Sequence, residues 1–232
     1  GLVIAVLLTA ILVVLLTGNN IFSQLGWNNG WMDRYLDRTT YSSGGVNADS
    51  NEVIVSDEAH VSASEIQKIK IDWVAGSVNL RVGTGSDIVF SGTSYRSLTD
   101  RQKMRYTVSD SGTLEIRFCE DLESIFNWFS LDANMPAKTL TMEVPASLMA
   151  QLEKLEVESV SANIDLSGVY GTKVDLSTVS GEIRCADIAT QEVELSTTSG
   201  AIVCENTTAD AIEVDNVSGS IRVEGEYKQV KA

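Results

Sequence analysis

The segment KVDLSTVSGEIRCADI, residues 173–188, is one of four similar segments that begin 19 residues apart. The other three are KLEVESVSANIDLSGV (154–169), EVELSTTSGAIVCENT (192–207) and AIEVDNVSGSIRVEGE (211–226). No insertion interrupts the spacing. Repetition at a short fixed period is typical of a solenoid, in which each repeat forms one coil that stacks on its neighbours.

Apolar and polar residues alternate within each segment, as they do in half-buried strands. The predicted inward columns are Leu155, Val174, Val193 and Ile212; Val157, Leu176, Leu195 and Val214; and Ile164, Ile183, Ile202 and Ile221. We also expect Val179 to point inward, before a corner at Ser180–Gly181 where glycine accepts a positive φ. The pattern predicts an all-β fold, a β-solenoid with 19-residue coils.

The residues before the repeats predict an irregular continuation of the same domain. Residues 66–82 alternate in the same way, and Val-Ala-Gly-Ser-Val at 74–78 aligns with Val-Ser-Gly-Glu-Ile at 179–183. Further strands are predicted at 87–92, 104–108, 113–118 and 138–145, and residues 123–131 are predicted to form a short helix or loop that caps the core or makes an exposed contact patch. The predicted domain spans 66–232, with an irregular half at 66–150 and regular coils at 152–228.

Residues 1–18 are predicted to form a transmembrane anchor. The stretch Leu2–Thr17 carries no charge, and its length is near the lower limit of about 17 residues for a membrane-spanning helix. A cleaved signal peptide and a buried helix are the alternatives. Residues 19–65 are predicted to be a polar linker or stalk, in which Trp27, Trp31 and Tyr35 suit an aromatic belt at the membrane surface.

The chain is acidic, with 32 Asp and Glu against 17 Lys and Arg, a net charge of −15. Such a surface repels phosphates, so no nucleic-acid partner is expected. The three cysteines form no CxxC motif. Cys185 and Cys204 are 19 residues apart, which predicts that they stack in adjacent coils as free buried thiols. A disulfide between them is the alternative.

No catalytic motif or cofactor motif occurs in the sequence. The single histidine, His60, lies in the predicted linker and is expected to be solvated, so we predict no catalytic residues, no cofactor and no enzymatic activity. One outward column is acidic in all four segments: Glu156, Asp175, Glu194 and Glu213. It fits either a weak Ca²⁺-binding or polycation-binding ladder, or a solvated acidic face eased by Lys154 and Lys173.

Three features of the sequence together resemble a known family: the early IDWVAGSVNL strand, the LTMEVP segment before the repeats, and the tandem Val-Ser-Gly-x-Ile coils (Val179–Ile183, Val217–Ile221). The chain resembles the putative-adhesin family of bacterial membrane-anchored β-strand-repeat proteins. The resemblance covers residues 66–223. It implies an anchored, extracytoplasmic β-solenoid of unknown function and transfers no catalytic residues.

We therefore predict a single-pass bacterial membrane protein whose extracytoplasmic bulk binds an envelope or host surface protein or glycan. The alternative is an accessory protein of a cell-envelope stress-sensing system. A polysaccharide-processing β-helix enzyme is the third hypothesis. It is disfavoured because the carboxylates of the acidic column lie in equivalent environments, whereas glycosidases need two carboxyl groups in unlike ones.

Overall fold

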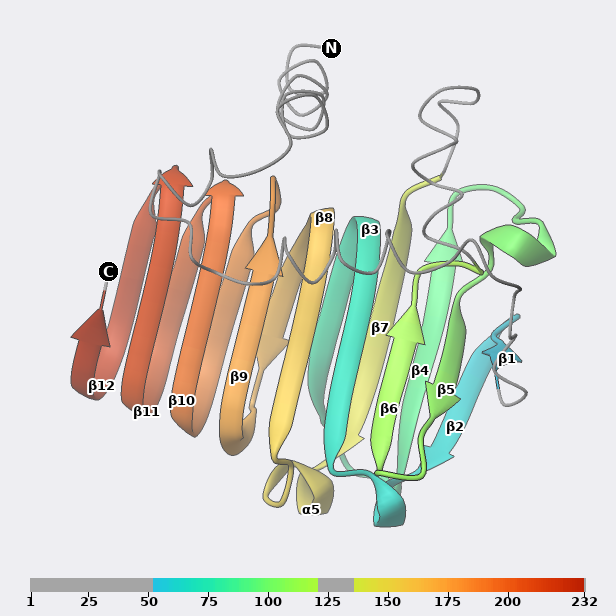
Figure 1. Ribbon diagram of the computed structural model, residues 1–232, viewed down its shortest axis with the longest axis horizontal. Helices are drawn as coiled ribbons and strands as arrows, with labels where there is room; N and C mark the ends of the chain where they lie inside the picture. Colours follow the sequence, from blue (N-terminus) through green and yellow to red (C-terminus); the bar gives the residue numbers. More distant parts are fainter. Residues whose placement is uncertain (1–51, 121–135, 232) are drawn as a thin grey trace, which may run out of the picture. The chain divides into compact units, whose positions relative to one another are not determined.

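The described part of the chain forms an all-β stack of twelve strands (Figure 1). The computed structural model describes residues 52–120 and 136–231. The strands are β1 (Val53–Ile54), β2 (Glu58–Ser62), β3 (Lys68–Gly83), β4 (Asp87–Ser94), β5 (Arg105–Val108), β6 (Thr113–Arg117), β7 (Lys138–Pro145), β8 (Lys154–Ser167), β9 (Tyr170–Thr178), β10 (Ile183–Ser199), β11 (Ile202–Ser218) and β12 (Ile221–Lys231). Short helical turns are η1 (Ala63–Glu65), η2 (Asp100–Gln102) and α5 (Ala146–Met149).

Three predicted segments lie outside the described residues: the anchor at 1–18, the part of the linker at 19–51 with the predicted aromatic belt, and the helix or loop at 123–131. Within the described residues, no helix is long and apolar enough to cross a membrane.

The repeats stack in parallel with a constant register. Ile183 of β10 pairs with Ile164 of β8 on one side and with Ile202 of β11 on the other, and Ile202 pairs with Ile221 of β12. Each coil contributes strand to both of the layers visible in Figure 1. The predicted β-solenoid-like stack of 19-residue coils is confirmed.

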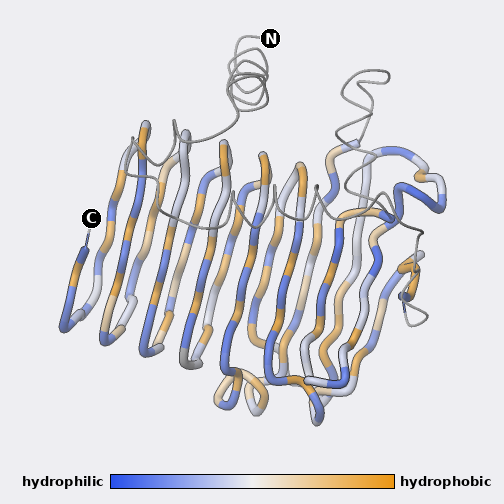
Figure 2. The backbone as a smooth tube through the Cα atoms, viewed as in Figure 1, coloured by the Kyte–Doolittle hydropathy of each residue, from blue (hydrophilic) through white to orange (hydrophobic). Residues whose placement is uncertain are grey.

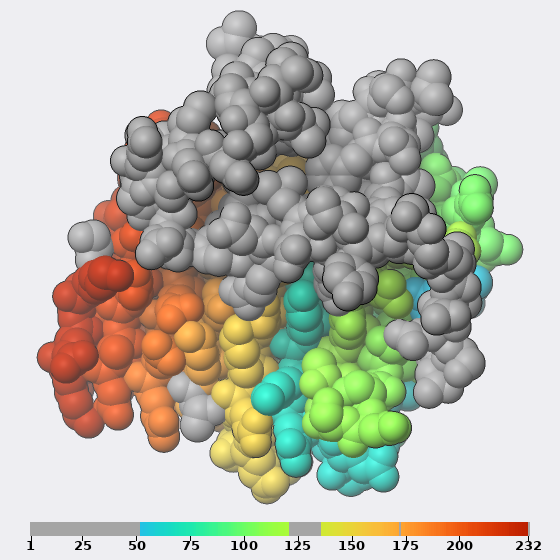
Figure 3. Space-filling model, viewed as in Figure 1, coloured from blue at the N-terminus to red at the C-terminus, as the bar shows by residue number. Residues whose placement is uncertain are grey.

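The inward columns form the core between the layers, and hydropathy alternates along every strand (Figure 2). The first two predicted columns are buried in all four coils, and so are Ile164, Ile183 and Ile202. Ile221 is the exception, because 45% of its surface is exposed. The prediction was wrong there because β12 ends the strand order, and the side chains of this last coil form one end of the stack (Figure 3).

β3 is the first coil of the stack. It pairs in parallel with β8 from Lys68 to Arg81, and Gly76 lies opposite Ala162. This register confirms the alignment of residues 74–78 with the repeats. β3 also pairs in parallel with β6 and β7. β7 in turn pairs antiparallel with β4, so the irregular half contains both parallel and antiparallel strand pairs.

The folded domain begins earlier than the sequence indicated. Part of the predicted linker forms β1 and β2, and β2 pairs antiparallel with β4. In β2, Ala59 and Val61 are buried while His60 between them is exposed. The boundary at residue 66 was therefore wrong, because a five-residue strand with two small inward residues gives only a weak periodic signal.

The corner of each coil differs from the prediction. Thr178 is 2% exposed and points inward, whereas Val179 is only half-buried. β9 continues through Thr178, so the alternation that buries Val174 and Leu176 also buries Thr178. The buried hydroxyl is paired, because it accepts a hydrogen bond from the Gly181 N–H (3.2 Å) and donates to the carbonyl of Ala162 (3.3 Å).

The same donor position recurs in other coils. Thr197 donates to the Gly181 carbonyl (3.3 Å), and the Asn216 amide donates to the Gly200 carbonyl (2.9 Å). In β3 the position is taken by Trp73, whose indole N–H donates to the Lys138 carbonyl (3.1 Å). We call Trp73, Thr178, Thr197 and Asn216 the corner donors. Each satisfies a backbone carbonyl at the corner of a neighbouring coil or strand, and that carbonyl would be costly to leave unpaired in a buried corner.

Gly181 and Gly200 are needed at their corners for space, and not for the positive φ that we expected. Gly181 and Gly200 are not among the residues with positive φ. A Cβ on Gly181 would lie 1.9 Å from the Ala162 carbonyl oxygen, and one on Gly200 would lie 2.0 Å from the Gly181 oxygen. The carbonyls that the corner donors bind are therefore the ones that exclude side chains at the glycines.

Positive φ occurs at the corner glycine of β3, Gly76 (φ 108°), and at a second bend of the coils. Gly168 (φ 69°), Asp187 (φ 56°) and Asn206 (φ 50°) follow each other at the 19-residue spacing. Gly, Asp and Asn are the residue types that adopt the left-handed conformation at least cost. The Asn206 amide also donates to the Asp187 carboxylate (2.5 Å), which links two neighbouring coils at this bend.

Replacing Gly200 with alanine is expected to lower the free energy of unfolding by about 1–3 kcal/mol, because the new Cβ forces the Gly181 carbonyl away. Urea denaturation measures the change. Ser199→Ala, at the exposed neighbouring position, is the matched control and is expected to leave stability nearly unchanged. Equal stability of the two variants would show that the close approach of the Gly181 carbonyl oxygen to Gly200 does not require glycine at this position.

Candidate functional site

The predicted acidic column is in register on β8–β11. Glu156 lies opposite Asp175, and Glu194 lies between Asp175 and Glu213. Its carboxylates are paired with lysines. Lys154 lies 2.5 Å from Glu156 and 3.1 Å from Asp175, Lys173 lies 2.8 Å from Glu194, and Lys231 contacts Glu213. We call this set the ionic rows.

The pKa shifts reflect this pairing. Burial raises the pKa of Asp175, and neighbouring carboxylates add to the rise while Lys154 opposes it. Burial alone would lower the pKa of Lys154 and Lys173, but their hydrogen bonds to carboxylates outweigh it and raise both values. The rows therefore neutralise much of their own charge. No group of three or more potential ligands lies close enough to hold a metal ion within the described ranges.

Millimolar Ca²⁺ is expected to leave the thermal midpoint of the full chain unchanged, because a bound ion would have to displace Lys154 and Lys173. Differential scanning calorimetry measures the midpoint. Magnesium at the same concentration controls for general ionic strength. A rise of the thermal midpoint with Ca²⁺ but not with magnesium would support Ca²⁺ binding by the acidic column.

The two repeat cysteines are neighbours, as the spacing predicted. Cys185 and Cys204 pair across β10 and β11, and both are buried free thiols. The hydrogen bond with Cys204 and burial raise the pKa of Cys185 well above its usual value. The Cys185 thiol therefore stays protonated, and both cysteines pack as small side chains in the core.

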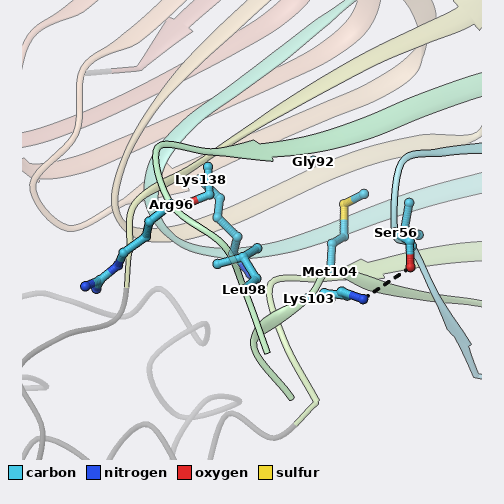
Figure 4. Close-up of a pocket in the computed structure, with 9 residues that line it drawn as sticks. Ser56, Gly92, Arg96, Leu98, Lys103, Met104 and Lys138 are labelled. Carbon is cyan, nitrogen blue, oxygen red and sulfur yellow. Dashed lines mark hydrogen bonds between the residues drawn. The ribbon is translucent and has the colours of Figure 1, made fainter. Parts of the chain in front are cut away.

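A cavity of about 190 Å³ lies in the irregular half, where no site was predicted (Figure 4). Its described lining residues come from several parts of the chain. They are Val55 and Ser56 after β1, Gly92 and Ser94 in β4, Arg96 and Leu98 in the loop after β4, Lys103 and Met104 before β5, and Lys138 at the start of β7. Three are cationic and none is acidic, in a chain with net charge −15. We call it the β4–β7 cavity.

Lys138 is held in an aromatic and carbonyl cage. Its ammonium donates to the carbonyls of Phe118 and Gln102, the latter at 2.6 Å. The nitrogen lies 3.5 Å from the ring centre of Phe118 and 5.6 Å from that of Trp73. The two rings meet edge to face at 5.0 Å. Cation–π attraction and the two carbonyls stabilise a charge that is otherwise removed from water.

The sequence held a signal for this lysine. Lys138 stands in phase with Leu140 and Met142 in KTLTMEVP, so the alternation that predicts β7 also predicts an inward lysine. An inward lysine in a strand needs buried partners. The alternation does not show which groups pair with the Lys138 ammonium, because Phe118 and Gln102 belong to other parts of the chain.

Burial lowers the pKa of Lys138 from 10.5 to about 7, with a small opposing effect of Cys119. Between these values the unfolded chain binds more protons than the folded one, so stability should rise with pH from about 7 toward about 8.5, where cysteines begin to titrate. Lys138→Met should remove this rise. Urea denaturation at several pH values measures the slope, and equal slopes in both proteins would contradict the assignment.

The family model described as Toastrack DUF4097 matches residues 37–231. The chain belongs to this family. Membership confirms the resemblance carried by the repeated Val-Ser-Gly-x-Ile motif, and the Toastrack DUF4097 match begins before residue 66, as the folded domain does.

Two solved structures are similar to this Toastrack DUF4097 chain. One is a "putative cell adhesion protein" from Clostridium sporogenes ATCC 15579, with a TM-score of 0.46 and 10% identity, covering 78% of this chain and 98% of that one. The other is a "putative adhesin" from Parabacteroides distasonis ATCC 8503, with a TM-score of 0.42 and 17% identity, covering 78% and 77%. The search of curated proteins gave no match.

Proposed function

We propose that the chain is a membrane-anchored, extracytoplasmic binding module of adhesion type that acts without catalysis. The observation that carries the proposal is a flat array of hydroxyl and amide side chains, with one carboxylate, on the outer surface of four paired strands, β4, β7, β3 and β8. The array consists of Thr93, Thr139, Ser77 and Asn163 in one row, and Ser91, Thr141, Asn79 and Asp165 in the next. We call it the polar array.

The array is rigid because its strands are fixed from below. Leu140 and Met142 alternate with the outward residues of β7 and are fully buried. Within the array, the Ser77 hydroxyl donates to the Thr139 hydroxyl (3.0 Å), and the Asn163 carbonyl oxygen accepts from the Glu182 backbone N–H (3.0 Å). These bonds orient the side chains before any partner binds, which reduces the entropy lost on binding.

The chemistry of the array suits a glycan. Hydroxyls and amides both donate and accept hydrogen bonds, as sugar hydroxyls do. Neighbouring strands place them about 4.8 Å apart, and alternate residues of one strand lie about 6.7 Å apart. A flat surface of this kind can contact several sugar units at once, and weak contacts then add up over its area.

A second candidate, an accessory role in a cell-envelope stress-sensing system, draws on the ionic rows. They lie on β8–β11 and carry both signs of charge, which suits recognition of a protein surface with complementary charges. Co-purification of a membrane-bound sensor with the full chain would favour this role. Loss of the complex with Lys173→Gln, but not with Thr141→Arg, would separate it from glycan binding.

Thr141→Arg should abolish glycan binding, because a long charged side chain disrupts the middle of the polar array. The loss expected on a glycan array is at least about tenfold in affinity. Thr208→Arg, on an exposed strand position of β11, is the matched control and should bind as the unchanged chain does. Equal binding by both variants, or no binding by the unchanged chain, would refute the array as the binding surface.

Protease treatment of intact cells tests the proposed location. If the domain is extracytoplasmic and anchored, external protease should remove it while a cytoplasmic marker stays intact. Protection of the domain until the membrane is permeabilised would refute the location. This result is independent of which surface binds the partner.

A further inference from the structure

The stack has two ends at which the described strands leave an edge unpaired. β12 pairs only with β11 at one end, and at the other β1 pairs only with β5 and β2 only with β4 (Figure 1). Such an edge exposes backbone N–H and C=O groups that can pair with a further strand. Most of the exposed large apolar side chains in the described residues also lie at these ends: Val53 and Ile54 in β1, Val217 at the end of β11, and Ile221 and Val230 in β12.

The strands at the two ends run in the same direction. In one layer, strand pairing leads from the start of β12 through β11, β10, β8, β3, β7 and β4 to β2, and only the last two pairings are antiparallel. The two reversals cancel, so β2 is parallel to the start of β12. In the other layer, two antiparallel pairings through β5 and β6 likewise make β1 parallel to β3 and to the end of β12. A second copy placed beyond β12 therefore meets it with two parallel strands, as the regular coils meet each other.

The strand register also matches across such a junction. Successive strand pairs connect Glu58 of β2 with Arg222 of β12 along one level of the layer: Glu58, Ser91, Thr141, Asn79, Asp165, Arg184, Val203 and Arg222. Ala59 is connected in the same way with Val223, one residue further along both strands. A copy that continues the stack therefore places Glu58 opposite Arg222 on the outside and Ala59 opposite Val223 on the inside.

The outward charges are compatible with this register. Glu58 meets Arg222, and two residues further along both strands His60 meets Glu224. In the single chain, His60 pairs with Glu58 at 2.9 Å and Arg222 pairs with Glu224 at 2.9 Å. Each of these side chains is more than half exposed, so the pairs within one strand stabilise the free chain little. The junction therefore adds partners of opposite sign across the two strands and places no like charges directly opposite each other at these positions.

Contact between two β12 edges is the alternative way to join two copies. A two-fold axis would pair the strands antiparallel, and full overlap centres on Gly225. Arg222 would then lie opposite Lys228, and Glu224 would lie opposite Glu226. Like charges directly opposite each other destabilise a strand pair. The charge order of β12 therefore favours β2 as its partner over a second β12.

The junction also covers apolar surface. Val53 of β1 belongs to the inward column that contains Val214, and Val230 of β12 belongs to the column that contains Ile212. Val214 and Ile212 are buried, whereas Val53 and Val230 are exposed at the two ends. Covering these side chains with another copy removes them from water, which favours association.

We propose that copies of this chain stack end to end, with β12 of one copy pairing in parallel with β2 and β1 of the next. The contact is heterologous, so each copy keeps one free end and the assembly grows along the stack axis. The proposal goes beyond the binding role and does not rest on it, because β1, β2 and β12 carry no residue of the polar array.

Cross-linking of the full chain with a short bis-maleimide tests the order and the register. A mixture of Glu58→Cys and Arg222→Cys is expected to give a covalent dimer, because opposite residues of paired strands lie about 4.8 Å apart. Each variant alone should give none, since the native cysteines are buried. Arg184→Cys, in the same outward column inside the stack, is the matched control and should not cross-link to Glu58→Cys. No cross-link in the first mixture, a dimer from Arg222→Cys alone, or an equal yield with the control would each overturn the stacking.

Sedimentation velocity of the full chain over a range of concentrations measures the association itself. Arg222→Glu is expected to raise the concentration needed for association about tenfold, because it places two carboxylates opposite each other. Adding Glu58→Arg to the same chain should restore association. Arg184→Glu removes an arginine that pairs with Glu182 at 3.0 Å, as Arg222 pairs with Glu224, and it should associate like the unchanged chain. A monomeric unchanged chain at every concentration, equal loss in both single variants, or no recovery in the double variant would contradict the proposed contact.

Discussion

The carbonyl at each corner of the stack is the group on which the rest of the structure depends. It accepts a hydrogen bond from a corner donor of the next coil, and it lies so close to the following glycine that no Cβ fits. A shift of one residue would place a side chain against this carbonyl and leave the donor unpaired. Together the two requirements fix the coil length at 19 residues and exclude neighbouring registers.

A fixed register is what turns a repeated sequence into ordered surfaces. Because Val174 stacks on Val193 and Ile183 on Ile202, the outward residues between them must also stack. Like charges in such a column repel each other, so the acidic column is stable only with lysines reaching across the coils. Lys154 contacts carboxylates of its own coil and of the next one, which is the arrangement that a constant register makes possible.

The sequence was sufficient for those features that depend on local alternation and constant spacing. The columns, the pairing of Cys185 with Cys204 and the first coil in β3 all follow from them. The corner was misjudged because Val179 is more apolar than Thr178, and only the strand geometry shows that the threonine points inward. The irregular half depends on contacts between distant segments, such as β7 with β3 and β4, and a single sequence does not contain that information.

The contrast between the lysines shows where distinct chemistry can arise in this fold. Lys154 and Lys173 occupy equivalent positions in successive coils, and the same kind of carboxylate neighbours raises the pKa of each. Lys138 belongs to the part of the chain where repetition ends. Its neighbours there are two carbonyls and two aromatic rings, and its burial lowers its pKa, which is the opposite direction. Repeated coils give the members of a column inside the stack similar environments. A site with unlike groups therefore requires the irregular half, and the β4–β7 cavity lies there because that is where the chain departs from its own repeat.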